Sequence, residues 1–169
     1  MVCRWGVRLK RDYIELRCRS AFSFLAGASL PEDLIARAAA LDYPALALGD
    51  RDGVYGAPRF HQAARRAGLR AIVGAELQLQ VVKLLGCYAV RSEHPPSSPN
   101  NPTTNTLTTC SLYVLVADRT GYQNLCRLIT QAKLRAPKGE SIVTWDDLEG
   151  RTNGLICLAG GAIGQVVSC

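Results

Sequence analysis

Histidine is scarce in this sequence, with only His61 and His94 among 169 residues. A hydrolytic metal centre needs several neutral imidazoles or carboxylates to hold its cations and to lower the pKa of a bound water molecule. His61 falls within a helical pattern, where we expect it at the surface, and His94 falls within a proline-rich stretch. The scarcity therefore speaks against a histidine-rich metal centre.

Long hydrophobic runs are missing as well. No stretch reaches the roughly 18 apolar residues of a membrane span, and the basic start of the chain has no apolar segment behind it that would make a signal peptide. We therefore expect a cytoplasmic protein with no membrane partner.

Paired cysteines are also lacking. The seven cysteines are odd in number and form no C-x-x-C motif, so neither a zinc site nor a disulfide framework is indicated. We interpret them as free thiols that act mostly as small buried hydrophobes, such as Cys157 in the apolar segment GLICLAG.

The sequence does have the balance of one soluble domain, with 48% hydrophobic and 20% charged residues. Its net charge of +6 is uneven, because residues 1–19 hold six Arg or Lys against two acids. We interpret residues 1–12 as a solvated basic leader and residues 13–169 as the folded domain. Contact of the leader with nucleic-acid phosphates stays open as an alternative.

Apolar patterns divide the domain into alternating strands and helices. Strands are predicted at residues 13–18, 44–50, 70–82, 111–118 and 154–160, and helices at residues 29–43, 57–69 and 120–136. Residues 87–109 interrupt the pattern with four prolines and many Ser, Thr and Asn residues, which predicts a long loop or disordered insertion. The alternation predicts an α/β fold with a parallel sheet, either open or closed into a barrel.

Local signals mark two of the helix starts. Ser29 and Glu32 have the spacing of a capping box, with Pro31 in the first turn, and Thr120 is a candidate cap for the third helix. The face that the third helix is expected to bury consists of Tyr122, Leu125, Leu128, Ile129 and Ala132.

Charged side chains follow three of the predicted strands, at the ends where α/β folds place their functional groups. They are Arg17 and Arg19, then Asp50, Arg51 and Asp52, and then Glu76. Arg17 and Arg19 have the spacing of a metal-ligand pair on one face of a strand, but a guanidinium has no lone pair to offer a metal. We expect the three groups to meet at one edge of the sheet.

Five segments carry a family resemblance: LRCRSAFSFLAGAS, ALALGDRDGVYGAPRFHQAA, GLRAIVGAEL, TGYQNLCRLIT and GLICLAGG. Together they resemble, over roughly residues 13–165, the amino-terminal PHP (polymerase and histidinol phosphatase) domain of bacterial C-family DNA polymerases, in particular the alpha subunit of DNA polymerase III of the error-prone type. The resemblance implies a distorted barrel of seven β/α units. Because the sequence offers five strand candidates, we expect a partial barrel.

The resemblance also implies where a metal site would lie. In active members, which hold divalent metals such as zinc or manganese, the first strand ends in His-x-His-Ser, a loop carries Asp-Gly, and the next strands end in Thr-Asp-His and Gly-x-Glu. The matching positions here are Arg17, Arg19, Ala26, Asp50, Arg51 and Glu76. Only Asp50 and Glu76 keep ligand chemistry, so the resemblance implies a degenerate site with no metal cofactor and no catalytic residue.

The function implied by the resemblance is that of a metal-ligand-depleted, structural domain of an error-prone DNA-directed DNA polymerase, a nucleotidyltransferase of DNA replication and repair synthesis. Nothing matches the polymerase palm, so we expect no activity of this chain alone. Its implied partners are the rest of the polymerase polypeptide and, through that enzyme, DNA. Two alternatives stay open: a metal-dependent phosphoesterase or 3'-5' exonuclease of the PHP superfamily, and a basic nucleic-acid-binding module.

Three arginines at former ligand positions lead to a structural hypothesis. Arg17, Arg19 and Arg51 would occupy the space of the lost metals and pair with the remaining carboxylates of Asp50, Asp52 and Glu76. Such pairing avoids the cost of leaving a buried charge unpaired, on the order of 3 to 5 kcal/mol. The alternative is that the same guanidinium groups contact a phosphate or a DNA backbone, for which their planar fork is well suited.

Overall fold

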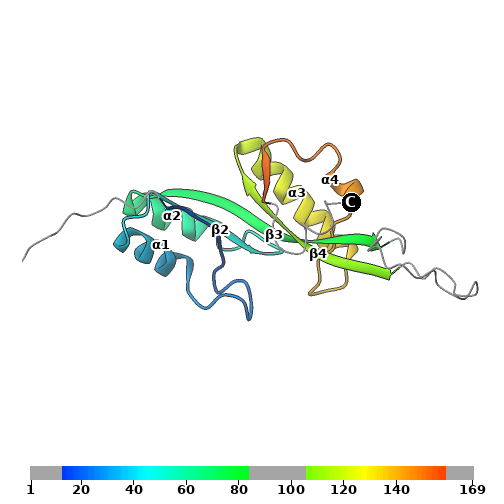
Figure 1. Cartoon of the computed structure of the whole chain (residues 1–169), viewed down its shortest axis with the longest axis horizontal. Coiled ribbons are helices and arrows are strands. Elements are labelled where there is room, and N and C mark those ends of the chain that lie inside the picture. The colour runs from blue at the N-terminus through cyan, green and yellow to red at the C-terminus, as the bar shows by residue number, and fades with distance from the viewer. Residues whose placement is uncertain (1–12, 84–105, 159–169) are drawn as a thin grey trace, which may run out of the picture.

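The computed structural model describes residues 13–83 and 106–158, which form one curled sheet with helices packed on it (Figure 1). The strands are β1 (Glu15–Cys18), β2 (Ala45–Arg51), β3 (Arg70–Lys83), β4 (Thr106–Val116) and β5 (Leu155–Leu158). The helices are α1 (Pro31–Ala40), α2 (Ala57–Ala67), α3 (Arg119–Arg135) and α4 (Trp145–Leu148). The predicted α/β class is confirmed.

The strands lie side by side in the order β1-β2-β3-β4-β5. The first three are parallel, as predicted, and are connected through α1 and α2. β4 is antiparallel to both of its neighbours, which corrects the prediction of a wholly parallel sheet. It pairs with β3 from Gly74 against Leu115 to Lys83 against Thr106, so the chain returns directly along the strand that it has just formed.

This long pairing also moves the boundary of the insertion predicted at residues 87–109. Its last four residues belong to β4, where Thr106 pairs with Lys83 and Thr109 with Gln80. Threonine is β-branched and favours strands, so the Thr-rich end of the segment suits a ladder better than a loop. The rest of the predicted insertion, including His94, and the predicted leader at residues 1–12 lie outside the described residues.

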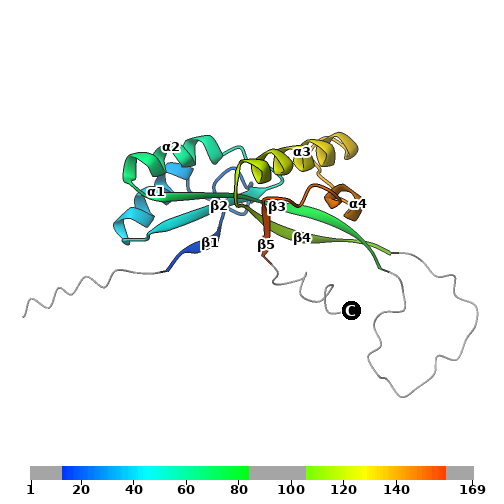
Figure 2. The same ribbon diagram turned by 90° about the horizontal axis from the view of Figure 1, so that it is seen from above.

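Helices α1, α2 and α3 cover one face of the sheet, while β1 and β5 curl toward the other face (Figure 2). One apolar cluster packs α1 and α2 on β2 and consists of Ile35, Ala38, Leu46, Leu48, Phe60 and Ala64. A second packs α3 on β3 and β4 and includes Ala75, Leu77, Leu79, Leu112, Val114, Leu125, Ile129 and Ala132. A smaller cluster of Ala47, Tyr113 and Leu115 lies on the concave face of this half-barrel.

Helix α1 begins differently from the predicted capping box. Its N-cap residue is Leu30, and no side chain caps the helix. Ser29 instead uses its carbonyl to accept a backbone hydrogen bond from the preceding loop, and Glu32 pairs with Arg59 at 2.6 Å. Pro31 does occupy the first turn, as predicted.

Helix α3 is capped by Asp118 instead of Thr120. The Asp118 side chain accepts a hydrogen bond from the Gly121 N–H at 2.8 Å. Tyr122, predicted on the buried face, is exposed. Cys126, one turn later on the same side of the helix, is only half-buried. The other residues expected on that face are buried: Leu125, Leu128, Ile129 and Ala132.

The described cysteines have different surroundings. All four are free thiols; Cys110 is buried, whereas Cys18 and Cys126 are half-buried. Cys157, predicted to be buried, is exposed because β5 is the last strand at one edge of the described sheet. Among residues 13–83 and 106–158, no helix has the length and apolar character needed to cross a membrane.

Candidate functional site at the strand ends

The carboxylate of Asp50, at the end of β2, is buried and accepts three hydrogen bonds from the loop after β1. The Ser20 N–H and the Ser23 hydroxyl donate to Oδ1 at 2.8 and 2.7 Å, and the Ser20 hydroxyl donates to Oδ2 at 2.8 Å. A buried carboxylate is retained in proteins when its oxygens are satisfied in this way. Asp50 therefore fixes the loop between β1 and α1.

Asp50 faces away from Glu76. Side chains alternate between the two faces of a strand, and Arg51, not Asp50, is the register partner of Glu76 in β3. Leu48, two residues before Asp50, packs in the helix layer, so Asp50 also points to that side. The two carboxylates that the resemblance assigns to a metal site thus lie on opposite faces of the sheet.

The loop fixed by Asp50 is compact. The N–H groups of Ala26 and Gly27 both donate to the Ser23 carbonyl at 2.9 Å. A Cβ on Gly27 would lie 2.1 Å from the Ser20 carbonyl oxygen, so only glycine fits there. Ala26, where the resemblance expects an aspartate, is exposed and has no side-chain ligand atom.

Glu76 is buried on the concave face and forms an ion pair with Arg19. The contact joins Nη2 of Arg19 to Oε2 of Glu76, and the two side chains are 36% and 6% exposed. A guanidinium held against a carboxylate satisfies a charge that burial would otherwise penalise. This is a pairing of the kind that the sequence hypothesis expects, formed between Arg19 and Glu76.

Arg17 makes a different contact on the same face. Its guanidinium carbon lies 5.3 Å from the ring centroid of Tyr113, a cation–π arrangement. Tyr113 is buried, which raises the pKa of its phenol, and its hydroxyl has no hydrogen-bond partner in the described part of the chain. The ring lies against Gly49, where a Cβ would be 2.1 Å from the Tyr113 hydroxyl. The close approach of the Tyr113 ring to β2 therefore requires glycine at position 49.

Arg51 ends β2 with a largely exposed side chain, and its Nε lies 3.7 Å from Oδ2 of Asp52. Asp52 has a left-handed backbone with φ of 52°, and its N–H donates to the Glu76 carbonyl at 2.8 Å. Its Oδ1 accepts a hydrogen bond from the Gln78 N–H at 3.3 Å, while burial raises the pKa of the Asp52 carboxyl. These contacts tie the end of β2 to β3.

The predicted site residues do gather at one edge of the sheet, but they do not fit a divalent metal. Arg17, Arg19 and Arg51 offer no lone pair. The Asp50 oxygens accept hydrogen bonds and the Glu76 carboxylate faces Arg19. Within residues 13–83 and 106–158, no three His, Cys, Asp or Glu side chains are grouped as metal ligands. A metal-dependent step has no support in these residues.

Three residues at this edge are not predicted from the sequence to belong to the site: Ser20, Ser23 and Tyr113. Ser20 stands at the serine of the His-x-His-Ser motif, so that motif could have marked it as a partner of the second strand. Tyr113 reaches the site because it is the cross-strand partner of Glu76 in the antiparallel pair of β3 and β4. No local pattern reveals that pairing.

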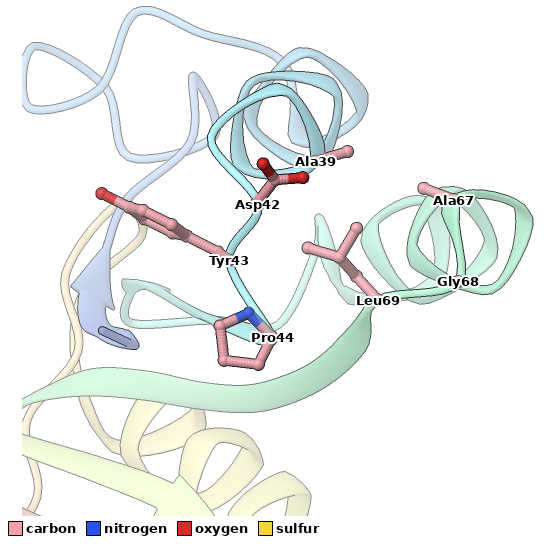
Figure 3. Close-up of a pocket in the computed structure, with 7 residues that line it drawn as sticks. All are labelled: Ala39, Asp42, Tyr43, Pro44, Ala67, Gly68 and Leu69. Carbon is pink, nitrogen blue, oxygen red and sulfur yellow. The ribbon is translucent and has the colours of Figure 1, made fainter. Parts of the chain in front are cut away.

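A separate hollow of about 370 Å³ lies at the opposite end of β2, beside the last turns of α1 and α2 (Figure 3). It is lined by Ala39, Asp42, Tyr43, Pro44, Ala67, Gly68 and Leu69. β2 begins directly after Pro44, so this hollow lies at the amino end of the strand, whereas Asp50 and Arg51 lie at the carboxyl end. None of the predicted site residues lines it.

Comparisons with known proteins agree with this architecture. The family model of the PHP domain matches residues 15–169. The chain is 40% identical over 165 residues to the error-prone DNA polymerase of Anaeromyxobacter sp. (strain K), covering 92% of this chain and 13% of that protein. For the error-prone DNA polymerase of Ralstonia nicotianae the identity is 41% over 149 residues, with coverages of 88% and 12%. The chain thus spans about an eighth of the length of these relatives.

Two solved structures are similar at lower identity. One, described as a metal-dependent phosphoesterase from Bifidobacterium adolescentis, is 16% identical with a TM-score of 0.47, covering 85% of this chain and 45% of that one. An amidohydrolase from Chromobacterium violaceum is 23% identical with a TM-score of 0.49, covering 72% of this chain and 33% of that one. The family model, in contrast, extends over all five described strands. The chain belongs to the PHP domain family.

Proposed function

We propose that this chain is a structural, non-catalytic PHP domain of an error-prone DNA-directed DNA polymerase, in which arginine contacts have taken the place of a metal site. In this proposal the chain performs neither nucleotidyl transfer nor phosphoester hydrolysis. It acts in the cytoplasm as part of a polymerase polypeptide and meets DNA through the rest of that polypeptide.

The ion pair between Arg19 and Glu76 is the observation that carries this proposal. It places a permanent cation against the buried carboxylate that the Gly-x-Glu motif would offer to a metal. The neighbouring Arg17 packs on Tyr113 and fills more of the same concave face. These contacts would stabilise the strand ends without a metal ion, which suits a domain whose role is structural.

A restoration experiment tests the proposal. The triple variant R17H/R19H/R51H returns imidazoles to the three positions where the resemblance expects them and frees the Glu76 carboxylate. We expect it to bind Mn²⁺ with about one ion per chain, measured by isothermal titration calorimetry, because carboxylate oxygens suit Mn²⁺ and neutral imidazole is the commonest metal-binding side chain in proteins.

The matched control is R66H/R119H/R127H, which places three imidazoles at separate exposed positions on α2 and α3. It should bind no more Mn²⁺ than the unchanged chain. If the site variant also binds no more than this control, the arginines do not stand at a former metal site, and that part of the proposal is wrong.

A further inference from the structure

Three arginines gather on the outward face of α2, on the helical side of the sheet (Figure 2). A surface hollow of about 650 Å³ lies along this face. It is lined by Pro58, Arg59, His61, Gln62, Arg65 and Arg66, all of which belong to α2. Within the described part of the chain, no acidic side chain lines it. The face is therefore positively charged.

Two of these arginines are available to a partner. Arg65 and Arg66 are exposed, and neither forms an ion pair within residues 13–83 and 106–158. Arg59, in contrast, pairs with Glu32 of α1, its Nε lying 2.6 Å from Oε1. This pair shows that a carboxylate can approach the guanidinium groups of this surface closely, which is the geometry that charge-assisted hydrogen bonds require.

An aromatic ring borders the basic face. The guanidinium carbon of Arg59 lies 5.9 Å from the ring centroid of Phe22, and Phe22 is 39% exposed. The Phe22 N–H donates to the Ser20 hydroxyl oxygen at 3.2 Å, and Ser20 is itself bound to the buried Asp50. The backbone that carries the ring is thus held in place, so little conformational entropy is lost when a partner packs on it.

This arrangement suits a protein better than a nucleic acid. Protein interfaces combine aromatic anchors with arginines, whereas surfaces for single-stranded nucleic acids place aromatic rings among their cations so that successive bases can stack. Within the described residues, no Phe, Tyr or Trp lines the hollow, and Phe22 stands at one end of it beside Arg59. From Arg59 to Arg66 the helix rises about 10 Å, a length that about three residues of an extended peptide span.

We propose that this face of α2 binds an acidic segment of another protein, with carboxylates on Arg65 and Arg66 and an apolar side chain on Phe22. The positive face would attract such a segment and select against basic ones, because opposite charges across an interface favour association and like charges oppose it. The inference goes beyond the proposed structural role, since it gives the helical side of the domain a partner of its own.

Fluorescence anisotropy of two short peptides tests the inference. Each peptide carries fluorescein and is titrated with the whole 169-residue chain. One is an oligoglutamate, and the other is the same oligoglutamate with one phenylalanine added at its end. We expect both to bind at low salt, the second more tightly because its ring can pack on Phe22. An oligoglutamine of the same length should not bind.

The double variant R65Q/R66Q tests the role of the two arginines. It should weaken oligoglutamate binding about fivefold, the effect of losing two exposed ion pairs of ordinary strength. The matched control is R119Q/R127Q, which removes two exposed arginines from α3 and lowers the net charge equally. The control should bind the peptide nearly as tightly as the unchanged chain does.

Phe22→Ala tests the role of the ring. It should remove the advantage of the phenylalanine-containing peptide and leave the binding of oligoglutamate nearly unchanged. Leu134→Ala, which truncates an 82% exposed side chain on α3, should preserve that advantage. Circular dichroism should be the same for all four variants, because none of the substituted residues is buried.

Three results would overturn the inference. The oligoglutamate could fail to bind at low salt. R65Q/R66Q could bind it as tightly as R119Q/R127Q does, which would assign binding to cations elsewhere, such as those of residues 1–12. An oligothymidylate with the same number of charges could bind more tightly than the oligoglutamate and lose that binding in R65Q/R66Q, which would identify the face as a nucleic-acid surface.

Discussion

At the scale of single residues, the two carboxylates at this edge have separate tasks. Asp50 is surrounded by the hydroxyl and N–H donors of the loop that it anchors, whereas Glu76 is held by a guanidinium on the concave face. Both are buried charges with stabilising partners inside the fold. Each carboxylate therefore stabilises a different contact of the fold: Asp50 holds the loop after β1, and Glu76 holds Arg19.

Asp50→Ala should be strongly destabilising, because it leaves the buried Ser20 hydroxyl and N–H without their acceptor. We expect a loss of about 3 kcal/mol or more in the free energy of unfolding, the effect of removing several hydrogen bonds to one buried charge. Urea denaturation followed by circular dichroism measures it.

Asp33→Ala is the control for that substitution, since Asp33 is an exposed aspartate in the first turn of α1. It should cost less than about 1 kcal/mol. Equal midpoints for the two variants would show that Asp50 does not anchor the loop.

At the scale of elements, the short helix α4 is held by one buried side chain. Asp147 closes a capping box with Thr144 and accepts two hydrogen bonds from Arg135, from Nη1 to Oδ2 at 2.5 Å and from Nη2 to Oδ1 at 2.8 Å. The Arg135 guanidinium holds the pKa of Asp147 well below its usual range. The folded state therefore prefers the ionised carboxylate.

This preference predicts the pH dependence of stability. A carboxyl with a lowered folded-state pKa stabilises the protein above its ordinary value near 4, and the stabilisation is lost as the pH falls below that value. Asp147→Asn should thus be less stable than the unchanged chain at pH 7, and the difference should shrink steadily between about pH 5 and pH 2.

Urea midpoints across that pH range measure the effect, with Asp33→Asn as the control. At pH 7 the control should differ from the unchanged chain by much less than Asp147→Asn does. A constant difference between Asp147→Asn and the unchanged chain down to pH 2 would mean that Arg135 does not favour the ionised form.

The elements also show what the sequence can and cannot predict. Strands β1, β2 and β3 and helices α1 and α2 follow from apolar periodicity and from local residues such as Pro31, because those signals act within a few residues. The direction of β4 and the position of Tyr113 beside Glu76 depend on pairing across the sheet. Local sequence patterns do not reveal that pairing. Asp50 and Glu76 lie on opposite faces because the register between β2 and β3 pairs Arg51 with Glu76, and local patterns do not reveal this register either.

At the scale of the whole molecule, the described residues form a half-barrel with helices on its convex side (Figure 2). Arg17 and Arg19 contact Tyr113 and Glu76 on its concave side. The family resemblance predicts a degenerate metal site at this edge. The structure shows how each arginine is placed: Arg19 pairs with Glu76, Arg17 packs on the ring of Tyr113, and the largely exposed Arg51 lies near Asp52.

The central claim is that this edge of the barrel supports structure without a metal. Its most direct test is the manganese content of the unchanged chain after dialysis against Mn²⁺ and removal of free ions, measured by mass spectrometry together with hydrolysis of p-nitrophenyl phosphate. We predict far less than one ion per chain and no hydrolysis above the background. A stoichiometric ion accompanied by metal-dependent hydrolysis would contradict the account.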